Sequence, residues 1–443
     1  MLLSLLIAAA FAAPDTLSLA YAQRLAETHA DAVALADVGT QLAATRVQQA
    51  RSARLPIVSL QANTSLWTDA HPISFLPPGS IDCATLSAGI DALCNRLSTP
   101  ITARNQVTGS ASLRVVQPLT ALFTARDTID AADAGADAAD ANKQAVLEEA
   151  RYQAADAWLL AAQADQQLDV VHGSIHALEA RVVTAQFAYD AHALTRGDLL
   201  LVRLALATAQ QTELQVSSLR DTSRARLGLA VGDAGARPAP SDEVMAPPRS
   251  APDADALVAR ALASRDELKA LRAQVVASEA ASNAAHLARL PQVNAIGVAT
   301  HSAGQGLFAE PNSAFVGATL DWTLFGGGRQ RLGFEAAQRA TDAARARLTA
   351  AESGVTVEVL ARLDALRSAA GAYALAGQRV AVAEESLALV DTRHRAGTAT
   401  MTELLDAEAA LTGARSSQAA ALYDAHRAEV ALTRAVGDDP WAL

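Results

Sequence analysis

Acidic side chains at helical spacing are the residues of this 443-residue chain with the clearest capacity for chemistry. One acidic stripe recurs every three or four residues and consists of Asp127, Asp130, Asp133, Asp137 and Asp140. At this spacing the five carboxylates share one face of a helix. Two interpretations stay open: a solvated outer face, or the lining of a water-filled passage that prefers cations. The helical spacing excludes a calcium loop, whose ligands alternate along a loop.

Other acidic residues lie where a turn leads into a long helical segment. Glu403 and Asp406 follow the turn at 397–400, and Asp198 is the counterpart of Glu403 in the first half of the chain. Acidic residues in a first helical turn are ordinary capping chemistry. If several copies converge there, the same carboxylates form rings, which select cations in channels. Our hypothesis is a pore constriction at Glu403, Asp406 and Asp198.

The sequence offers little support for a metal site, a reactive cysteine or a nucleotide-binding loop. Cys83 and Cys94 are the only cysteines, and in an exported protein such a close pair predicts a disulfide. Two cysteines make a poor zinc site, and His172 and His176 lack the glutamate of a zinc-protease helix. The glycines at 326–328 are not followed by the lysine of a phosphate loop. We therefore predict no metal, no cofactor and no enzymatic activity.

Alternating polar and apolar residues predict the strands that accompany these sites. The pattern is clear at 57–67 and 106–117, and it returns more weakly at 293–299 and 314–322. The clear segments have about the 9–11 residues that a tilted membrane strand needs. The alternative is an ordinary two-hairpin sheet on a soluble domain.

Very long helices favour the membrane interpretation. A first helix is predicted over 17–53. No proline interrupts 122–192, and within this segment we predict that one helix ends and the next begins near Gly173. A similar helix is predicted over 329–395. At about 1.5 Å per residue each long segment spans on the order of 100 Å, which exceeds any globular core. Such helices need neighbours along their whole length, as in a coiled coil or a helical tube.

The chain reads as one duplicated unit of two strands followed by long helices. We predict a secretory signal at 1–12, a first repeat at 13–232, a linker at 233–253 and a second repeat at 254–443. The net charge of -11, without any basic stripe, argues against nucleic acid as a partner. Four strands per chain cannot close a membrane barrel, so a barrel requires self-association.

Several motifs carry a family resemblance when they are taken together and in order. They are Leu55-Pro56 and Leu290-Pro291 at strand openings, Gln117-Pro118-Leu119 and Leu324-Phe325-Gly326-Gly327-Gly328 at strand-to-helix joints, and Gly397-Thr398 through Leu404-Leu405-Asp406-Ala407 at the second helix end. With these motifs the chain resembles the TolC-like outer-membrane efflux proteins over almost its whole mature length.

The resemblance implies a mainly α protein with membrane β structure. It implies a homotrimer, in which a 12-strand barrel in outer-membrane lipid continues into a 12-helix periplasmic barrel. It also implies a passive exit duct of a tripartite efflux pump or a type I secretion system. The partners would be a periplasmic adaptor and an inner-membrane pump. By matching position, Glu403 and Asp406 look like the acidic rings of the periplasmic aperture, and Asp198 looks like a latch partner.

The chain departs from the family pattern at its helix ends. His394 and Ala399 are neither the Tyr nor the Arg of the best-known latch, and the first turn reads Ala191-His192-Ala193-Leu194 in place of the usual Val-Gly-Leu. The rival hypothesis is a periplasmic, alanine-rich coiled-coil scaffold or an adaptor-like interaction protein. Repeated ten-residue alternating segments beside long helices favour the channel, because a soluble scaffold has no use for them.

Overall fold

The computed structural model describes residues 15–77, 79–87, 89–241, 246, 249, 252–305 and 310–438. The predicted signal at 1–12 lies outside this part, as does much of the predicted linker. The chain divides into two compact units. The helical unit contains the residues up to 43, 135–275 and those from 343 on. The sheet unit contains 44–134 and 276–342. Each predicted repeat thus contributes to both units.

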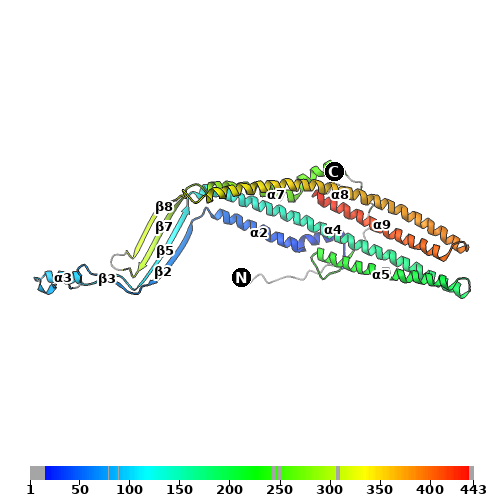
Figure 1. Cartoon of the computed structure of the whole chain (residues 1–443), viewed down its shortest axis with the longest axis horizontal. Helices are drawn as coiled ribbons and strands as arrows, with labels where there is room; N and C mark the ends of the chain where they lie inside the picture. The colour runs from blue at the N-terminus through cyan, green and yellow to red at the C-terminus, as the bar shows by residue number, and fades with distance from the viewer. Residues whose placement is uncertain are drawn as a thin grey trace. The chain divides into compact units, whose positions relative to one another are not determined.

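The sheet unit contains a four-stranded antiparallel sheet in which the strands lie side by side (Figure 1). Its strands are β2 (Ile57–Leu66), β5 (Val107–Pro118), β7 (Gln292–Ala303) and β8 (Asn312–Asp321), in the order β2-β5-β7-β8. All four predicted strands are present, and β7 is longer than its weak alternation indicated. Among the described helices, none combines the length and the apolar character that a membrane-spanning helix requires.

The connection from β2 to β5 has structure of its own. It contains β3 (His71–Ile73), the 3-10 turn η1 (Cys83–Thr85), α3 (Ile90–Ser98) and β4 (Ile101–Arg104). Strands β3 and β4 pair as an antiparallel ribbon, which carries α3 beyond the end of the main sheet (Figure 1). We call residues 68–105 the loop head.

Four long helices dominate the fold. They are α4 (Ala121–Asp190), α5 (Arg196–Ala230), α8 (Arg329–Arg395) and α9 (Met401–Val436). The predicted boundary between two helices at Gly173 is wrong, because α4 continues through this residue without a break. A helical glycine costs only about 1 kcal/mol relative to alanine. The buried residues around Gly173 offset this cost, since they recur three and four positions apart like a coiled-coil seam: Leu168, Val171, Ile175 and Leu178.

The predicted single helix over 17–53 is also wrong. It is two helices, α1 (Leu19–His29) and α2 (Asp31–Ser52), separated by Ala30 in an extended conformation with ψ 132°. Tertiary packing explains the break. Gly232, at φ 88°, lies so close to α1 that a Cβ on it would come within 2.5 Å of the His29 carbonyl oxygen. Alanine itself gives no signal for a helix end.

The second half repeats this break. Helices α6 (Ala254–Ser264) and α7 (Asp266–Leu287) are separated by Arg265, which has ψ 124°. Gly437, at φ 73°, packs against it, and a Cβ there would come within 2.9 Å of Arg265 Cγ. The duplication read from the sequence therefore extends to the backbone geometry of both helix breaks.

The described part of the predicted linker contains a short strand. This strand, β6 (Ala239–Pro240), pairs in parallel with β1 (Thr16–Leu17). Leu17 is fully buried in a cluster around Trp158 of α4. A second cluster packs α6 and α7 against α8 and α9 around Leu257, Leu268 and Val359. Both clusters belong to the helical unit.

Candidate functional site

The sheet has one mainly apolar face and one mainly polar face. In an antiparallel sheet, residues directly opposite each other point to the same side. The observed register therefore gathers onto one face Val58, Leu60, Ala62 and Leu66 of β2, Val107, Ala111, Leu113 and Val115 of β5, Ala295, Gly297 and Ala299 of β7, and Ala314, Val316, Ala318 and Leu320 of β8. Four polar residues share this mainly apolar face: Thr64, Gln117, His301 and Asn312. The opposite face gathers Ser59, Gln61, Asn63 and Ser65, Thr108, Ser110, Ser112 and Arg114, Asn294, Thr300 and Ser302, and Ser313, Thr319 and Asp321. Five apolar residues share this mainly polar face: Ile57, Val116, Ile296, Val298 and Phe315. Strands of a membrane barrel have this division between lipid and lumen.

Aromatic side chains flank the sheet at both ends. Trp67 directly follows β2. The Arg104 guanidinium lies over its ring, with Cζ 3.8 Å from the ring centre, and the Trp67 Nε1–H donates to Thr108 Oγ1 at 3.0 Å. At the opposite end, where β8 leads toward α8, Trp322 and Phe325 are exposed. Membrane barrels carry such aromatic girdles at the two lipid–water interfaces.

The sheet has two open edges. Strands β2 and β8 end the strand order, so one side of each has no partner strand within the four-stranded sheet. Unpaired backbone N–H and C=O groups at an edge are free to pair with another strand. In a lipid environment they must be paired, because no water is present to satisfy them. The sheet is therefore incomplete as a membrane structure until other strands close it.

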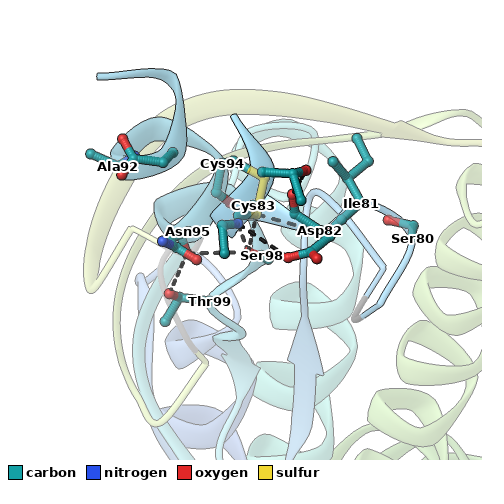
Figure 2. The surroundings of a disulfide bond; sticks show 12 residues. Ser80, Ile81, Asp82, Cys83, Ala92, Cys94, Asn95, Ser98 and Thr99 are labelled. Carbon is teal, nitrogen blue, oxygen red and sulfur yellow. Dashed lines mark hydrogen bonds between the residues drawn. A yellow bond between two sulfur atoms is a disulfide. The ribbon is translucent and has the colours of Figure 1, made fainter. Parts of the chain in front are cut away.

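A disulfide holds the loop head together. Cys83 and Cys94 are bonded, with their Cα atoms 5.6 Å apart, and Ser98 Oγ–H donates to the Cys94 carbonyl at 2.7 Å (Figure 2). The bond joins η1 to α3. Apolar residues on one face of α3 are exposed, namely Ile90, Leu93 and Leu97.

The helix ends position the predicted constriction residues. At the start of α9, Thr400 and Glu403 form a reciprocal capping box. The Thr400 backbone N–H donates to Glu403 Oε2 at 2.7 Å, and the Glu403 N–H donates to Thr400 Oγ1 at 3.2 Å. The hydrogen bond from the Thr400 backbone lowers the pKa of Glu403, and the Thr400 hydroxyl and the Arg393 charge act in the same direction. Glu403 is therefore anionic at neutral pH, with its side chain 48% exposed.

The first helix end repeats this arrangement. At the start of α5, Thr195 caps the helix by accepting the Asp198 N–H, and its hydroxyl donates to Asp198 Oδ2 at 2.7 Å. Both helix ends share one apolar cluster in the helical unit, which includes Leu199, Val202, Met401 and Leu404. The capping role of Asp198 and Glu403 is thus visible in the structure. The same packing brings the ends of the two helix pairs together.

The turn between α8 and α9 is held by a contact of its own. His394 Nδ1 lies 3.1 Å from the Ala399 carbonyl oxygen, a contact within this turn. Asp406 is exposed on the second turn of α9. The role of Glu403, Asp406 and Asp198 as a constriction stays a prediction.

The acidic stripe on α4 faces water for most of its length. Asp130, Asp137 and Asp140 are exposed, and Asp133 pairs with Arg51 of α2 at 3.2 Å. His172 pairs with Glu213 of α5 at 3.1 Å. Among the residues that the structure describes, no three His, Cys, Asp or Glu side chains gather where they would hold a metal ion.

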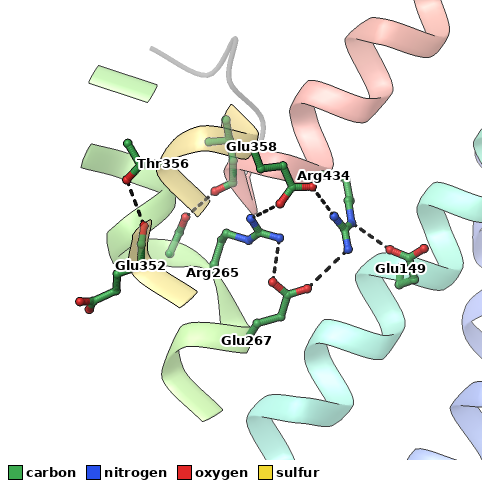
Figure 3. Close-up of polar contacts among 9 residues, drawn as sticks. Glu149, Arg265, Glu267, Glu352, Thr356, Glu358 and Arg434 are labelled. Carbon is green, nitrogen blue, oxygen red and sulfur yellow. Dashed lines mark hydrogen bonds and ion pairs between the residues drawn. The ribbon is translucent and has the colours of Figure 1, made fainter. Parts of the chain in front are cut away.

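The helical unit contains an ion-pair network that the sequence did not predict. Arg265, between α6 and α7, donates to Glu358 of α8 at 2.7 Å and pairs with Glu267 at 2.7 Å (Figure 3). Arg434 of α9 pairs with the same Glu358 at 2.7 Å and with Glu149 of α4 at 2.8 Å. The Arg265 side chain is only 4% exposed. No motif marks these residues, since the network joins four segments far apart in the chain.

Burial and charge act on Glu358 in opposite directions. Burial alone raises its pKa, but the hydrogen bond from Arg265 and the charges of Arg265 and Arg434 outweigh burial and hold the pKa below its ordinary value. The network therefore keeps Glu358 ionised inside the helical unit.

The second half of the chain is similar to a known family. Residues 257–438 match the family model described as "Outer membrane efflux protein". The match covers most of the second predicted repeat. The predicted resemblance to outer-membrane efflux proteins is thereby confirmed for this part of the chain. No curated protein gives a significant sequence match.

Solved outer-membrane proteins share the efflux-protein fold. The outer membrane protein VceC of Vibrio cholerae is 18% identical, with a TM-score of 0.76 over 95% of this chain and 96% of its own. The CmeC outer membrane channel of Campylobacter jejuni is 14% identical, with a TM-score of 0.74 over 95% and 86%. The open-state MtrE channel of Neisseria gonorrhoeae is 15% identical, with a TM-score of 0.72 over 95% and 89%. The predicted absence of enzymatic activity is consistent with these channel relatives.

Proposed function

We propose that this protein is the outer-membrane exit duct of a tripartite efflux pump or a type I secretion system. The observation that carries the proposal is the two-faced sheet with two open edges. Its apolar face suits lipid, its polar face suits a wet lumen, and its edges β2 and β8 require strands from sister copies. Three copies, the number that the family resemblance implies, supply twelve strands and twelve long helices. A periplasmic adaptor and an inner-membrane pump would deliver the substrate.

The duct performs no chemistry in this proposal. Substrates pass from the helical end to the exterior, and the energy comes from the pump. The direct test is conductance of the purified protein in planar lipid bilayers. Discrete channel openings are expected. Their absence under conditions in which a solved relative forms channels would refute the duct.

The face assignment predicts different effects for neighbouring residues of β2. Leu60 lies on the apolar face and Gln61 on the polar face. We expect Leu60→Arg to cost about 2–4 kcal/mol of folding into lipid, because it places a charge in the lipid layer. Gln61→Arg should change this free energy little, because its side chain reaches water. Folding into lipid vesicles, followed against denaturant, measures both. Equal effects of the two variants would refute the assignment.

We also propose that Glu403, Asp406 and Asp198 form the constriction at the helical end. Glu403→Gln combined with Asp406→Asn is expected to weaken block of the channel by multivalent cations on the order of tenfold, because it removes two carboxylate rings. Glutamine at 403 is compatible with the capping box, so α9 should begin as before. The measurement is single-channel current against added trivalent cation.

The matched control for the constriction is Asp364→Asn. Asp364 is an exposed acid of α8, 31 residues before that helix ends at Arg395, or about 45 Å along it. Its removal should leave the block unchanged. Unaltered block in the Glu403 and Asp406 double variant would assign these carboxylates to helix capping alone.

A further inference from the structure

Arg114 is an isolated cation on the polar face of the sheet. The four strands lie wholly within the described residues, and they contain one Lys or Arg side chain, Arg114 of β5, and one Asp or Glu side chain, Asp321 of β8. The register aligns Arg114 with Ser59 on one side and Val298 on the other, and Phe315 follows on β8. Ser59 is polar, Val298 and Phe315 are apolar, and none of the three carries a charge.

Asp321 is too distant to neutralise Arg114. It lies six residues along β8 from Phe315, the position level with Arg114, which corresponds to about 20 Å. It also accepts a hydrogen bond from Asn294 Nδ2 at 3.4 Å. At physiological ionic strength the Debye length is about 8 Å, so the two charges hardly interact through water. The positive charge of Arg114 therefore acts on whatever occupies the polar side of the sheet.

The position of Arg114 along the strand is equally informative. Seven residues of β5 precede it and four follow it, so its guanidinium belongs to the middle of the strand and not to a rim. A rim arginine would suit lipid headgroups. A mid-strand arginine on the apolar face would be costly in lipid. Arg114 lies on the polar face and is exposed, so its guanidinium can be hydrated.

We propose that Arg114 forms a positively charged ring inside the assembled barrel and that this ring favours the passage of anions. The inference rests on the proposed duct, in which each sister copy contributes one Arg114 at the same level. Rings of Arg or Lys select anions in pores, just as acidic rings select cations. The duct then contains two filters of opposite sign in series, the acidic helix ends and this basic belt. Anionic solutes are the class that the barrel itself favours.

The test is the reversal potential of the full-length protein in planar bilayers under a KCl gradient. Arg114→Gln is expected to lower the chloride-to-potassium permeability ratio on the order of fivefold at low salt. The difference should shrink toward none at 1 M salt, where the Debye length is about 3 Å. Arg114→Lys keeps the charge and should retain the ratio of the unaltered protein.

A gain-of-charge variant completes the experiment. Ser112 lies on the same face two residues before Arg114, level with Gln61 and Thr300. Ser112→Arg should raise the chloride preference, and an unchanged ratio would count against a lumen at this face. If the protein forms channels but Arg114→Gln leaves the ratio unchanged, the basic belt is overturned and the duct stands. If the unaltered protein forms no channels where a solved relative does, both are overturned.

Discussion

Replacing Trp158 with alanine is expected to cost the helical unit about 3–5 kcal/mol of unfolding free energy. The Trp158 ring is 1% exposed and packs in one cluster with Leu17, Leu227 and Tyr423. Its Nε1–H donates to the Leu17 carbonyl at 2.7 Å in buried surroundings. Alanine leaves a cavity and removes one of the two donors to that carbonyl, since the Ser241 backbone N–H also donates to it at 2.8 Å.

The consequence extends beyond α4. Leu17 belongs to β1, which pairs with β6 in the predicted linker. The contact between Trp158 and Leu17 therefore holds both short strands against α4. Denaturant unfolding of the protein in detergent, followed by far-ultraviolet circular dichroism, measures the loss. Protease cleavage within 233–241 should accelerate in the same variant.

Two controls separate the contributions at Trp158. Trp158→Phe retains most of the ring but removes the donor. The Leu17 carbonyl keeps the Ser241 N–H as a partner, so only the net contribution of one hydrogen bond, about 0.5–1.5 kcal/mol, is expected to be lost. Trp322→Ala removes an exposed tryptophan of the sheet unit and should leave the helical unit unchanged. A loss below about 1 kcal/mol in Trp158→Ala would mean that the cluster does not hold the linker.

Local sequence pattern was enough to predict the sheet. Alternation located β2 and β5 to within a residue or two, because each face of a strand meets one environment along its length. The two-faced arrangement of the whole sheet followed only from the register, since pairing is a long-range property. Weak alternation shortened the prediction for β7, where small residues such as Gly297 and Ala299 carry little hydrophobic signal.

Helix length was predictable and helix interruption was not. Absence of proline indicated α4 and α8, whereas the breaks at Ala30 and Arg265 arise from contacts with Gly232 and Gly437 far along the chain. Gly173 illustrates the converse, because a glycine that local propensity disfavours is tolerated in a packed helix. The acidic residues at the helix ends were located by sequence, and their capping partners Thr195 and Thr400 follow from simple spacing. The buried network around Arg265 has no local signature.

Replacing Arg265 with methionine is expected to cost about 3 kcal/mol of unfolding free energy. The guanidinium bonds Glu358 and Glu267 in a site where its side chain is 4% exposed. Removing one partner of a buried ion pair leaves the other charge poorly compensated, which costs about 3–5 kcal/mol. The lower end applies because Arg434 still pairs with Glu358. Unfolding in denaturant at pH 7 measures the difference.

A second substitution distinguishes lost charge compensation from lost packing. Arg265→Met together with Glu358→Met removes both charges, so the double variant should be more stable than Arg265→Met alone. Arg339→Met is the exposed control, since its pair with Asp342 is open to water and should contribute less than about 1 kcal/mol. If the double variant is no more stable than the single one, the cost arises from packing of the Arg265 stem and the ion pair is not its source.

Acid should reduce the effect of the Arg265 substitution. The pKa of Glu358 is lowered from its ordinary 4.5 in the folded protein, so its ion pairs contribute stability above pH 4.5, and this contribution fades as the pH falls through the folded value. The hydrogen bond from Arg265 is the strongest cause that lowers the pKa of Glu358, and Arg265→Met removes it. The ion pairs of Glu358 therefore contribute less stability in this variant, and acid removes less of it. The difference in unfolding free energy between the unaltered protein and Arg265→Met should therefore narrow below pH 4.5. A difference that stays constant from pH 7 to pH 3 would exclude Glu358 as the charge that Arg265 compensates.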